Sequence, residues 1–200
     1  MPRAPRVKRA DLTTPDLVVL SLLDERPRHG YEVNAELERR EVRDWAGVSR
    51  PQIYYSLDKL AGLGLLRIAK EDSAAAGPER SVLETTDSGR RHLADALEDA
   101  HWTGTPVHEP FLTWLALSWQ ARPPAFKKQL NRRKKYLEKK LAEEESTLED
   151  VLKEVGHPYH EAVWMLKLAI AKIELELKWL DEINAESPKR APAMRVPKLP

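Results

Sequence analysis

The stretch from Val48 to Leu66, VSRPQIYYSLDKLAGLGLL, constrains the fold more than any other part of the chain. Ser49 can cap a helix and Pro51 suits its first turn, because the first amides of a helix lack intrahelical partners. Three apolar residues then recur at helical spacing and form one stripe: Ile53, Leu57 and Leu60. The pattern predicts a short amphipathic helix over residues 49–61 that is buried on one side.

The other faces of this helix carry side chains that can hydrogen-bond to base edges. They are Arg50, Gln52, Tyr55, Ser56 and Lys59. A short helix divided in this way is typical of one that lies in a DNA major groove. Gly62 and Gly64 end the helix, and the apolar residues that follow predict a strand.

The neighbouring segments extend this prediction to a winged helix-turn-helix. Capping and turn residues place two shorter helices over residues 16–23 and 31–40. Extended runs at residues 65–70 and 80–85 flank a loop with a Gly-Pro pair, and another helix begins at Thr86. Helix-turn-helix followed by a β-hairpin defines a winged helix, in which the hairpin is a two-stranded wing.

The order of these elements and three short motifs resemble the PadR family of bacterial transcriptional regulators. The motifs are HGYEV at 29–33, SRPQIYYSLDKLAGLGLL at 49–66 and LETTDSGRRHL at 83–93. Trp45 and the Gln52-Ile53-Tyr54 run are most similar to the subgroup with a long C-terminal helical domain, the AphA-like or virulence-activator type. The resemblance implies a dimer that binds DNA, and it makes Tyr54 the recognition-helix tyrosine near a phosphate.

Any DNA-binding surface must be a local patch, because Lys+Arg 33 against Asp+Glu 32 leaves a net charge of only +1. Candidate phosphate contacts near the wing are Arg67, Lys70 and Arg80. Wings of the family often carry several basic residues, whereas here Glu71, Asp72 and Glu79 nearly offset Lys70 and Arg80. A further set lies in a flexible basic arm over residues 1–14, which either reaches a minor groove or is a solubilising tail: Arg3, Arg6, Lys8 and Arg9.

The second half of the chain predicts a helical domain. After the winged helix (15–100) we expect a linker (101–108), a helical dimerisation domain (109–186) and a Pro-rich tail (187–200). Two long helices with leucine stripes form an antiparallel coiled hairpin. The expected dimer interface is the heptad stripe of the last helix, Leu166, Ile170, Ile173, Leu177 and Leu180. A second stripe runs beside it, so this helix needs a further partner: Trp164, Leu168, Leu175 and Trp179.

Five of the six tryptophans lie beyond residue 100: Trp102, Trp114, Trp119, Trp164 and Trp179. They either fill the dimer core or line a pocket for a small aromatic effector, since the PadR resemblance implies planar ligands. No catalytic motif is present, and we expect no metal and no cofactor. The chain has no Cys, no secretory signal and no long apolar run, which predicts a cytoplasmic protein outside the membrane.

These features predict a mainly α protein with a winged helix-turn-helix and a helical dimerisation hairpin. Its expected function is that of a PadR-like transcriptional regulator, a repressor, that binds a pseudo-palindromic double-stranded DNA operator as a homodimer. The alternative is a protein-interaction adaptor that uses the same scaffold without binding DNA. The near-neutral charge and the acidic wing favour the adaptor slightly.

Overall fold

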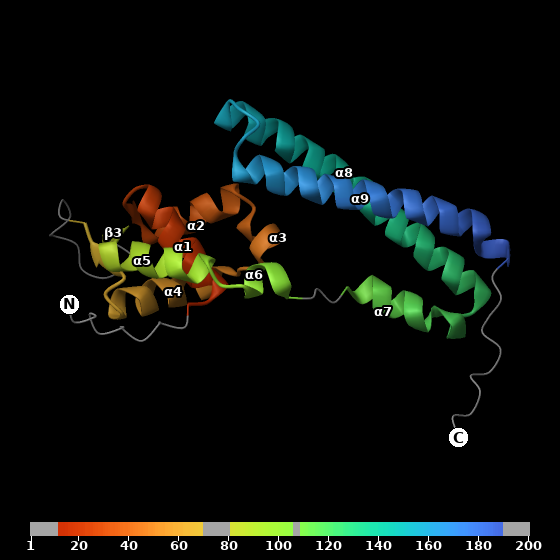
Figure 1. The fold of residues 1–200 in the computed structure, drawn as a ribbon, viewed down its shortest axis with the longest axis horizontal. Coiled ribbons are helices and arrows are strands. Elements are labelled where there is room, and N and C mark those ends of the chain that lie inside the picture. The colour runs from red at the N-terminus through yellow and green to blue at the C-terminus, as the bar shows by residue number, and fades with distance from the viewer. Residues whose placement is uncertain (1–11, 70–80, 106–108, 190–200) are drawn as a thin grey trace, which may run out of the picture. The chain divides into compact units, whose positions relative to one another are not determined.

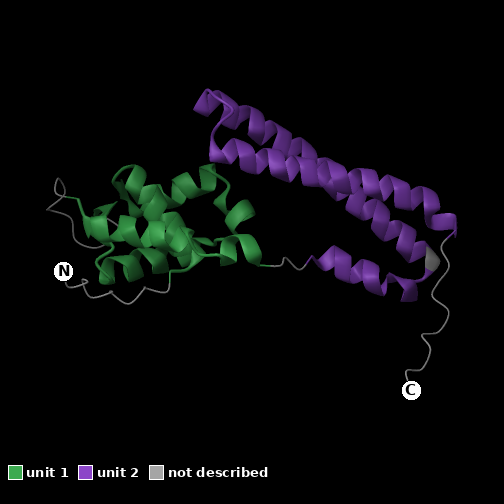
Figure 2. Ribbon diagram, viewed as in Figure 1, with its two compact units in different colours: residues 1–106 green, residues 107–200 purple. Residues whose placement is uncertain are grey.

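The computed structural model describes residues 12–69, 81–105 and 109–189. The chain divides into two compact units, Met1–Pro106 and Val107–Pro200 (Figure 1, Figure 2). The candidate residues of the basic arm (Arg3, Arg6, Lys8, Arg9) and of the wing loop (Lys70, Arg80) lie outside the described residues.

Helices dominate the N-terminal unit. They are α1 (Thr14–Glu25), α2 (Gly30–Arg39), α3 (Val42–Ala46), α4 (Arg50–Gly62), α5 (Asp87–Leu97) and α6 (His101–Gly104). As the sequence predicted, α4 begins after Ser49 with Pro51 in its first turn, and Gln52 closes a capping box. The short helix α6 lies inside the segment 101–108, for which the sequence predicts a linker.

Three short strands form one antiparallel sheet in the order β1-β3-β2: β1 (Arg28–His29), β2 (Leu66–Ile68) and β3 (Val82–Thr85). The register pairs Leu66 with Thr85 and Ile68 with Leu83, which builds the predicted hairpin. The sequence predicted two strands and a turn near His29, so β1 is a correction. A two-residue strand offers no alternation to detect, and it forms only because β3 has a free edge to pair.

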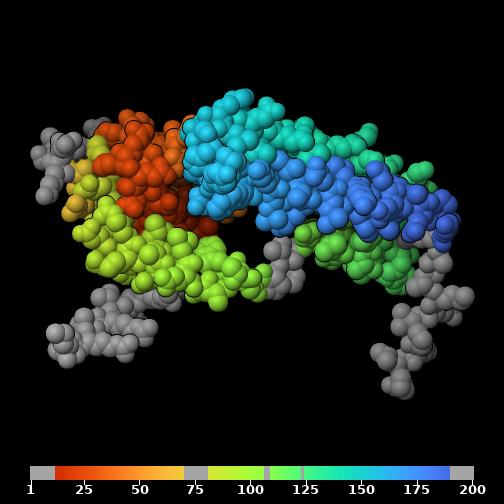
Figure 3. All heavy atoms as spheres, turned by 45° about the horizontal axis from the view of Figure 1, so that its top comes forward, coloured from red at the N-terminus to blue at the C-terminus, as the bar shows by residue number. Residues whose placement is uncertain are grey.

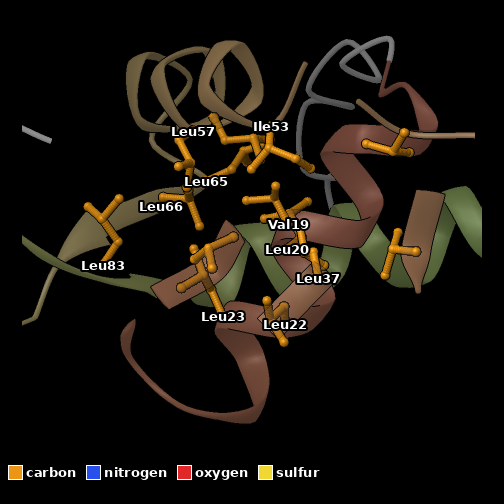
Figure 4. Packing of buried hydrophobic residues seen from close by; sticks show 14 residues of the cluster. Val19, Leu20, Leu22, Leu23, Leu37, Ile53, Leu57, Leu65, Leu66 and Leu83 are labelled. Carbon is orange, nitrogen blue, oxygen red and sulfur yellow. The ribbon is translucent and has the colours of Figure 1, made fainter. Parts of the chain in front are cut away.

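The core of the N-terminal unit lies between α1, α4 and the sheet (Figure 4). Val19 and Leu20 of α1 are fully buried, as is Leu60 of α4, and Leu57 packs in the same cluster. The predicted stripe of α4 is therefore the face that fixes this helix on α1. Leu65, Leu66 and Leu83 continue the cluster onto the sheet.

Gly89 allows α5 to approach the sheet closely. Thr86 caps α5, because its hydroxyl accepts a hydrogen bond from the Gly89 amide at 3.1 Å. A Cβ added at Gly89 would collide with the Leu65 carbonyl oxygen and lie 2.8 Å from Cγ2 of Thr85. Neither neighbour is the end of a flexible side chain that could swing away, so this position requires glycine.

The C-terminal unit is a helical hairpin with a short helix at its base. It contains α7 (Pro110–Leu117), a 3-10 turn (Ser118–Gln120), α8 (Pro123–Val155), α9 (Glu161–Glu186) and a second 3-10 turn (Ser187–Lys189). Gly156 ends α8 in the left-handed region, with φ 75. The helices α8 and α9 lie side by side along their length (Figure 1, Figure 3).

The heptad stripe of α9 packs inside this hairpin. Leu180 is fully buried with Leu130 and Leu137 of α8, and Ile173 and Leu177 are half-buried against the same cluster. Leu166 is also buried, and Ile170 is half-buried. The assignment of this stripe to a dimer interface was therefore wrong, because the stripe faces the matching leucines of its own α8.

The face of α9 that points away from α8, here called its outer face, is exposed. It comprises Trp164, Leu168, Ala171 and Leu175. The exposed fractions of Leu168 and Leu175 are 57% and 69%. Large apolar side chains spaced at four and seven residues form a continuous stripe on a helix. Trp164, Leu168 and Leu175 of the predicted second stripe lie on this outer face, whereas Trp179, its fourth member, is half-buried beside Phe111.

Replacing Gly89 with Ala should destabilise the N-terminal unit by about 1–3 kcal/mol, because the new methyl group overfills a packed contact. The matched control is Gly62→Ala at the end of α4, where an added Cβ meets nothing within 4 Å. Urea unfolding followed by circular dichroism measures both. Equal stability of Gly89→Ala and the wild type would contradict the required close approach.

Candidate nucleic-acid interface

The exposed side of α4 presents a small set of polar and aromatic side chains. Arg50, Gln52 and Tyr55 are exposed, and the exposed fraction of Tyr55 reaches 70%. Their neighbours Ile53 and Leu57 are buried in the core, so the helix cannot rotate without exposing them. The structure thus places three of the predicted groove-facing residues on one accessible surface.

Ser56 and Lys59 point the other way. Ser56 has an exposed fraction of 1%, and the Lys59 ammonium lies 2.6 Å from Oδ2 of Asp16 on α1. Positions 53, 56, 57 and 60 share one helical face, so the buried side of α4 is wider than the three-residue stripe suggested. The prediction that Ser56 and Lys59 face the groove was wrong for the described conformation.

Gln52 is partly engaged in holding the start of α4. Its Oε1 accepts hydrogen bonds from the amide and the hydroxyl of Ser49, both at 2.8 Å. The amide nitrogen of an Asn or Gln side chain is a separate donor. Gln52 can therefore cap the helix and still offer its NH2 group to a partner outside the protein.

Arg50 and Tyr54 act as a pair. The Tyr54 hydroxyl raises the pKa of the neighbouring Arg50 guanidinium above its ordinary value. Tyr54 is half-buried and packs against the core, so it restrains an otherwise exposed arginine. A restrained guanidinium loses less conformational entropy when it binds.

Arg43 is a candidate that the sequence reasoning missed. It lies on α3, is well exposed, and lines a shallow hollow together with Arg50 and Glu38. Its Nη2 is 3.6 Å from Oε1 of Glu38, a loose and solvent-screened ion pair. The sequence shows no sign of Arg43 because α3 has only five residues and shows no periodicity. This helix begins after Glu41, whose backbone lies in the left-handed region with φ 51.

Arg67 is the predicted wing cation that the structure describes. It is exposed, and its Nε lies 2.6 Å from Oε1 of Glu84 on the paired strand. The neighbouring carboxylate offsets part of its charge toward a phosphate. Arg67 is therefore a weaker candidate for phosphate contact than Arg50.

Two of the five tryptophans share one aromatic cluster. Trp114 and Trp179 belong to one aromatic cluster with Phe111 and Phe126, in which the Phe111 and Trp114 rings lie 5.5 Å apart. Trp119 and Trp164 are exposed outside that cluster. Trp102 belongs to the other unit, where its indole N–H donates to the Ala96 carbonyl at 2.8 Å.

A cation completes the aromatic cluster. The Arg133 guanidinium carbon lies 5.1 Å from the Phe111 ring centre and 5.5 Å from that of Tyr136. The same guanidinium makes two hydrogen bonds to Glu176, each 2.7 Å long. These bonds raise the pKa of Arg133 and fix its orientation beside the rings.

Other kinds of site find no support in the described part of the chain. No group of three or more His, Cys, Asp or Glu side chains there is arranged to hold a metal ion. None of the helices in those residues combines the length and the apolar character needed to span a bilayer.

The helix-turn-helix with its β-hairpin makes the N-terminal unit a winged-helix domain, followed by a helical unit. Residues 19–95 match the transcriptional regulator PadR-like family, so this chain carries a PadR-like domain, as the sequence motifs predicted. The family that this domain matches is one of transcriptional regulators. The finer assignment to the AphA-like subgroup stays a prediction.

Solved structures support the fold over most of the chain. Bacillus subtilis PadR in complex with operator DNA superposes with a TM-score of 0.73 at 18% identity, covering 89% of this chain and 99% of that one. The same protein in complex with p-coumaric acid gives 0.74 at 18% identity, covering 88% and 99%. The PadR-like regulator BC1756 from Bacillus cereus gives 0.68 at 18% identity, covering 90% and 100%. No curated protein matches this sequence.

Proposed function

We propose that this protein is a homodimeric transcriptional repressor that binds a pseudo-palindromic DNA operator through α4 and is released by a small planar aromatic effector. The observation that carries the proposal is the division of α4 into a core-anchored face and an exposed face with Arg50, Gln52 and Tyr55. Arg and Gln have the donors needed to read bases in the major groove. Arg43 and Arg67 are suited to contact phosphates beside it.

The PadR-like domain adds support from outside the chain. Bacillus subtilis PadR, which shares the fold, has been solved with operator DNA. A winged helix held rigidly by its core can enter a groove with little reorganisation, which favours tight binding. The competing adaptor function would not require a restrained, charged arginine at the start of the recognition helix.

Dimerisation is proposed through the outer face of α9. Trp164, Leu168 and Leu175 form an exposed apolar stripe, and such stripes mark contact surfaces in soluble proteins. A second copy of the same helix is the simplest complementary partner, and it generates a two-fold axis. That axis would hold two copies of α4 about 34 Å apart, one turn of DNA, or a multiple of it.

The effector is proposed to act at the aromatic cluster of Phe111, Trp114, Phe126 and Trp179. These side chains come from α7, α8 and α9, so a flat ligand that parts them would shift the helices relative to one another. Arg133 adds a fixed cation beside the rings, which suits a planar aromatic acid. Bacillus subtilis PadR has been solved with p-coumaric acid, a ligand of this chemistry.

Arg50→Ala and Tyr55→Ala should each weaken binding to DNA from the protein's own upstream region by about 1–3 kcal/mol, or roughly 5- to 150-fold. Fluorescence anisotropy at fixed salt measures the dissociation constants. Lys153→Ala, which removes an exposed cation from α8, should bind as the wild type does. If the Arg50 and Tyr55 double variant kept full affinity, the adaptor function would be favoured.

Leu168→Glu combined with Leu175→Glu should convert the dimer to a monomer, because a charge in an apolar interface must be desolvated without a partner. Sedimentation velocity at micromolar concentration measures the assembly state. Leu97→Glu makes the same change at an exposed leucine of α5 and should leave the dimer intact. A wild-type protein that sediments as a monomer would rule out this interface.

p-Coumaric acid should quench the tryptophan fluorescence in a saturable way if the aromatic cluster binds it. Trp164→Phe should keep this quenching, whereas Trp114→Phe with Trp179→Phe should abolish it. The double variant must first show a folded circular dichroism spectrum. Unchanged quenching in that variant would place the ligand elsewhere.

A further inference from the structure

A buried ion pair joins the recognition helix to α1. The Lys59 ammonium lies 2.6 Å from Oδ2 of Asp16, across 43 residues of sequence. The Asp16 side chain is fully buried, whereas 24% of the Lys59 side chain is exposed. The carboxylate therefore has no access to water, and the lysine reaches inward from the end of α4 to meet it.

The same carboxylate oxygen holds the start of α1. It accepts hydrogen bonds from the Thr13 amide at 2.7 Å and from the Thr13 hydroxyl at 2.8 Å. Burial opposes ionisation of Asp16, but its interactions with Lys59, Thr13 and the nearby Ser56 outweigh it and hold the pKa of the carboxyl below its usual value. One charged oxygen thus links the point where the chain enters α1 to the recognition helix.

We infer that Lys59 is a positioning residue for operator recognition, which sets the angle of α4 on α1 through Asp16 and does not itself contact DNA. The inference rests on the proposed DNA-binding function. Arg50 lies nine residues from Lys59, or roughly 14 Å along a rigid helix, so a tilt at one end displaces the other. Apolar side chains alone permit small shifts, whereas a charge-assisted hydrogen bond to a buried oxygen fixes one geometry.

Lys59→Met and Asp16→Asn separate positioning from direct contact. Each variant breaks the ion pair, but only Lys59→Met removes a cation. If Lys59 positions α4, both variants should lower operator affinity by a similar factor of about ten, the cost of one misaligned base contact. The double variant should bind no more weakly than either single one, because both changes remove the same interaction.

The salt dependence of binding gives a second readout. A lysine that contacts a phosphate contributes about 0.9 to the slope of log affinity against log salt concentration. We expect both variants to keep the wild-type slope. Arg67 is a candidate phosphate contact, so Arg67→Met should make the slope less steep. Arg91→Met removes an exposed cation from α5 and should change neither affinity nor slope.

Three outcomes would overturn the inference. A lower slope for Lys59→Met, with unchanged or higher affinity for Asp16→Asn, would show that Lys59 contacts DNA directly. Unchanged operator affinity in both variants, with only a lower melting temperature, would show that the pair merely stabilises the fold. Wild-type affinity in Lys59→Met alone would exclude positioning. A wild-type protein that binds no DNA would instead reject the proposed function. Lys59→Arg can keep the ion pair and should retain affinity. It is the control for misfolding caused by a substitution at this position.

Discussion

The apolar contact between α1 and α4 is the interaction on which the N-terminal unit depends. Leu20 of α1 and Leu60 of α4 are fully buried in the core that these two helices share. Removing a buried leucine side chain from such a core costs about 2–5 kcal/mol. The Asp16–Lys59 pair beside it contributes less net stability, because desolvating two charges offsets much of their attraction. Stability therefore comes from the leucines, while the ion pair selects one arrangement of the helices.

Much of this unit could be predicted from the sequence, because its signals are local. The capping residue Ser49, Pro51 and the spacing of Ile53, Leu57 and Leu60 define α4 within a few residues. The extended runs on either side of the wing loop predicted β2 and β3. By contrast, β1 and α3 are too short to show any periodicity, and they exist because neighbouring elements support them.

The side-chain assignments were harder to predict, because they depend on contacts between distant segments. Nothing near Lys59 in the sequence shows that its ammonium group will form an ion pair with Asp16. Likewise, α9 carries two apolar stripes, and only the packing of α8 decides which of them is buried. The sequence indicated correctly that α9 has more apolar surface than a hairpin can cover, but it assigned the wrong stripe to the exterior.

Charge in the C-terminal unit follows the same logic. The first half of α8 is strongly basic, which by itself resembles a second nucleic-acid surface. In the hairpin, Arg133 pairs with Glu176 and Lys134 with Asp181, so acidic residues of α9 offset part of this charge. These pairs match one antiparallel register, since a shift of one turn would separate them.

One face of α9 stabilises the fold of its own chain, and the other face is available to contact a second chain. Leu180 and Ile173 hold the hairpin together, whereas Leu168 and Leu175 project from the opposite side and are not needed for that purpose. Substitutions on the outer side can therefore accumulate without unfolding the protomer. Related regulators in one cell could diverge on this surface and avoid forming mixed assemblies, while keeping the same hairpin beneath it.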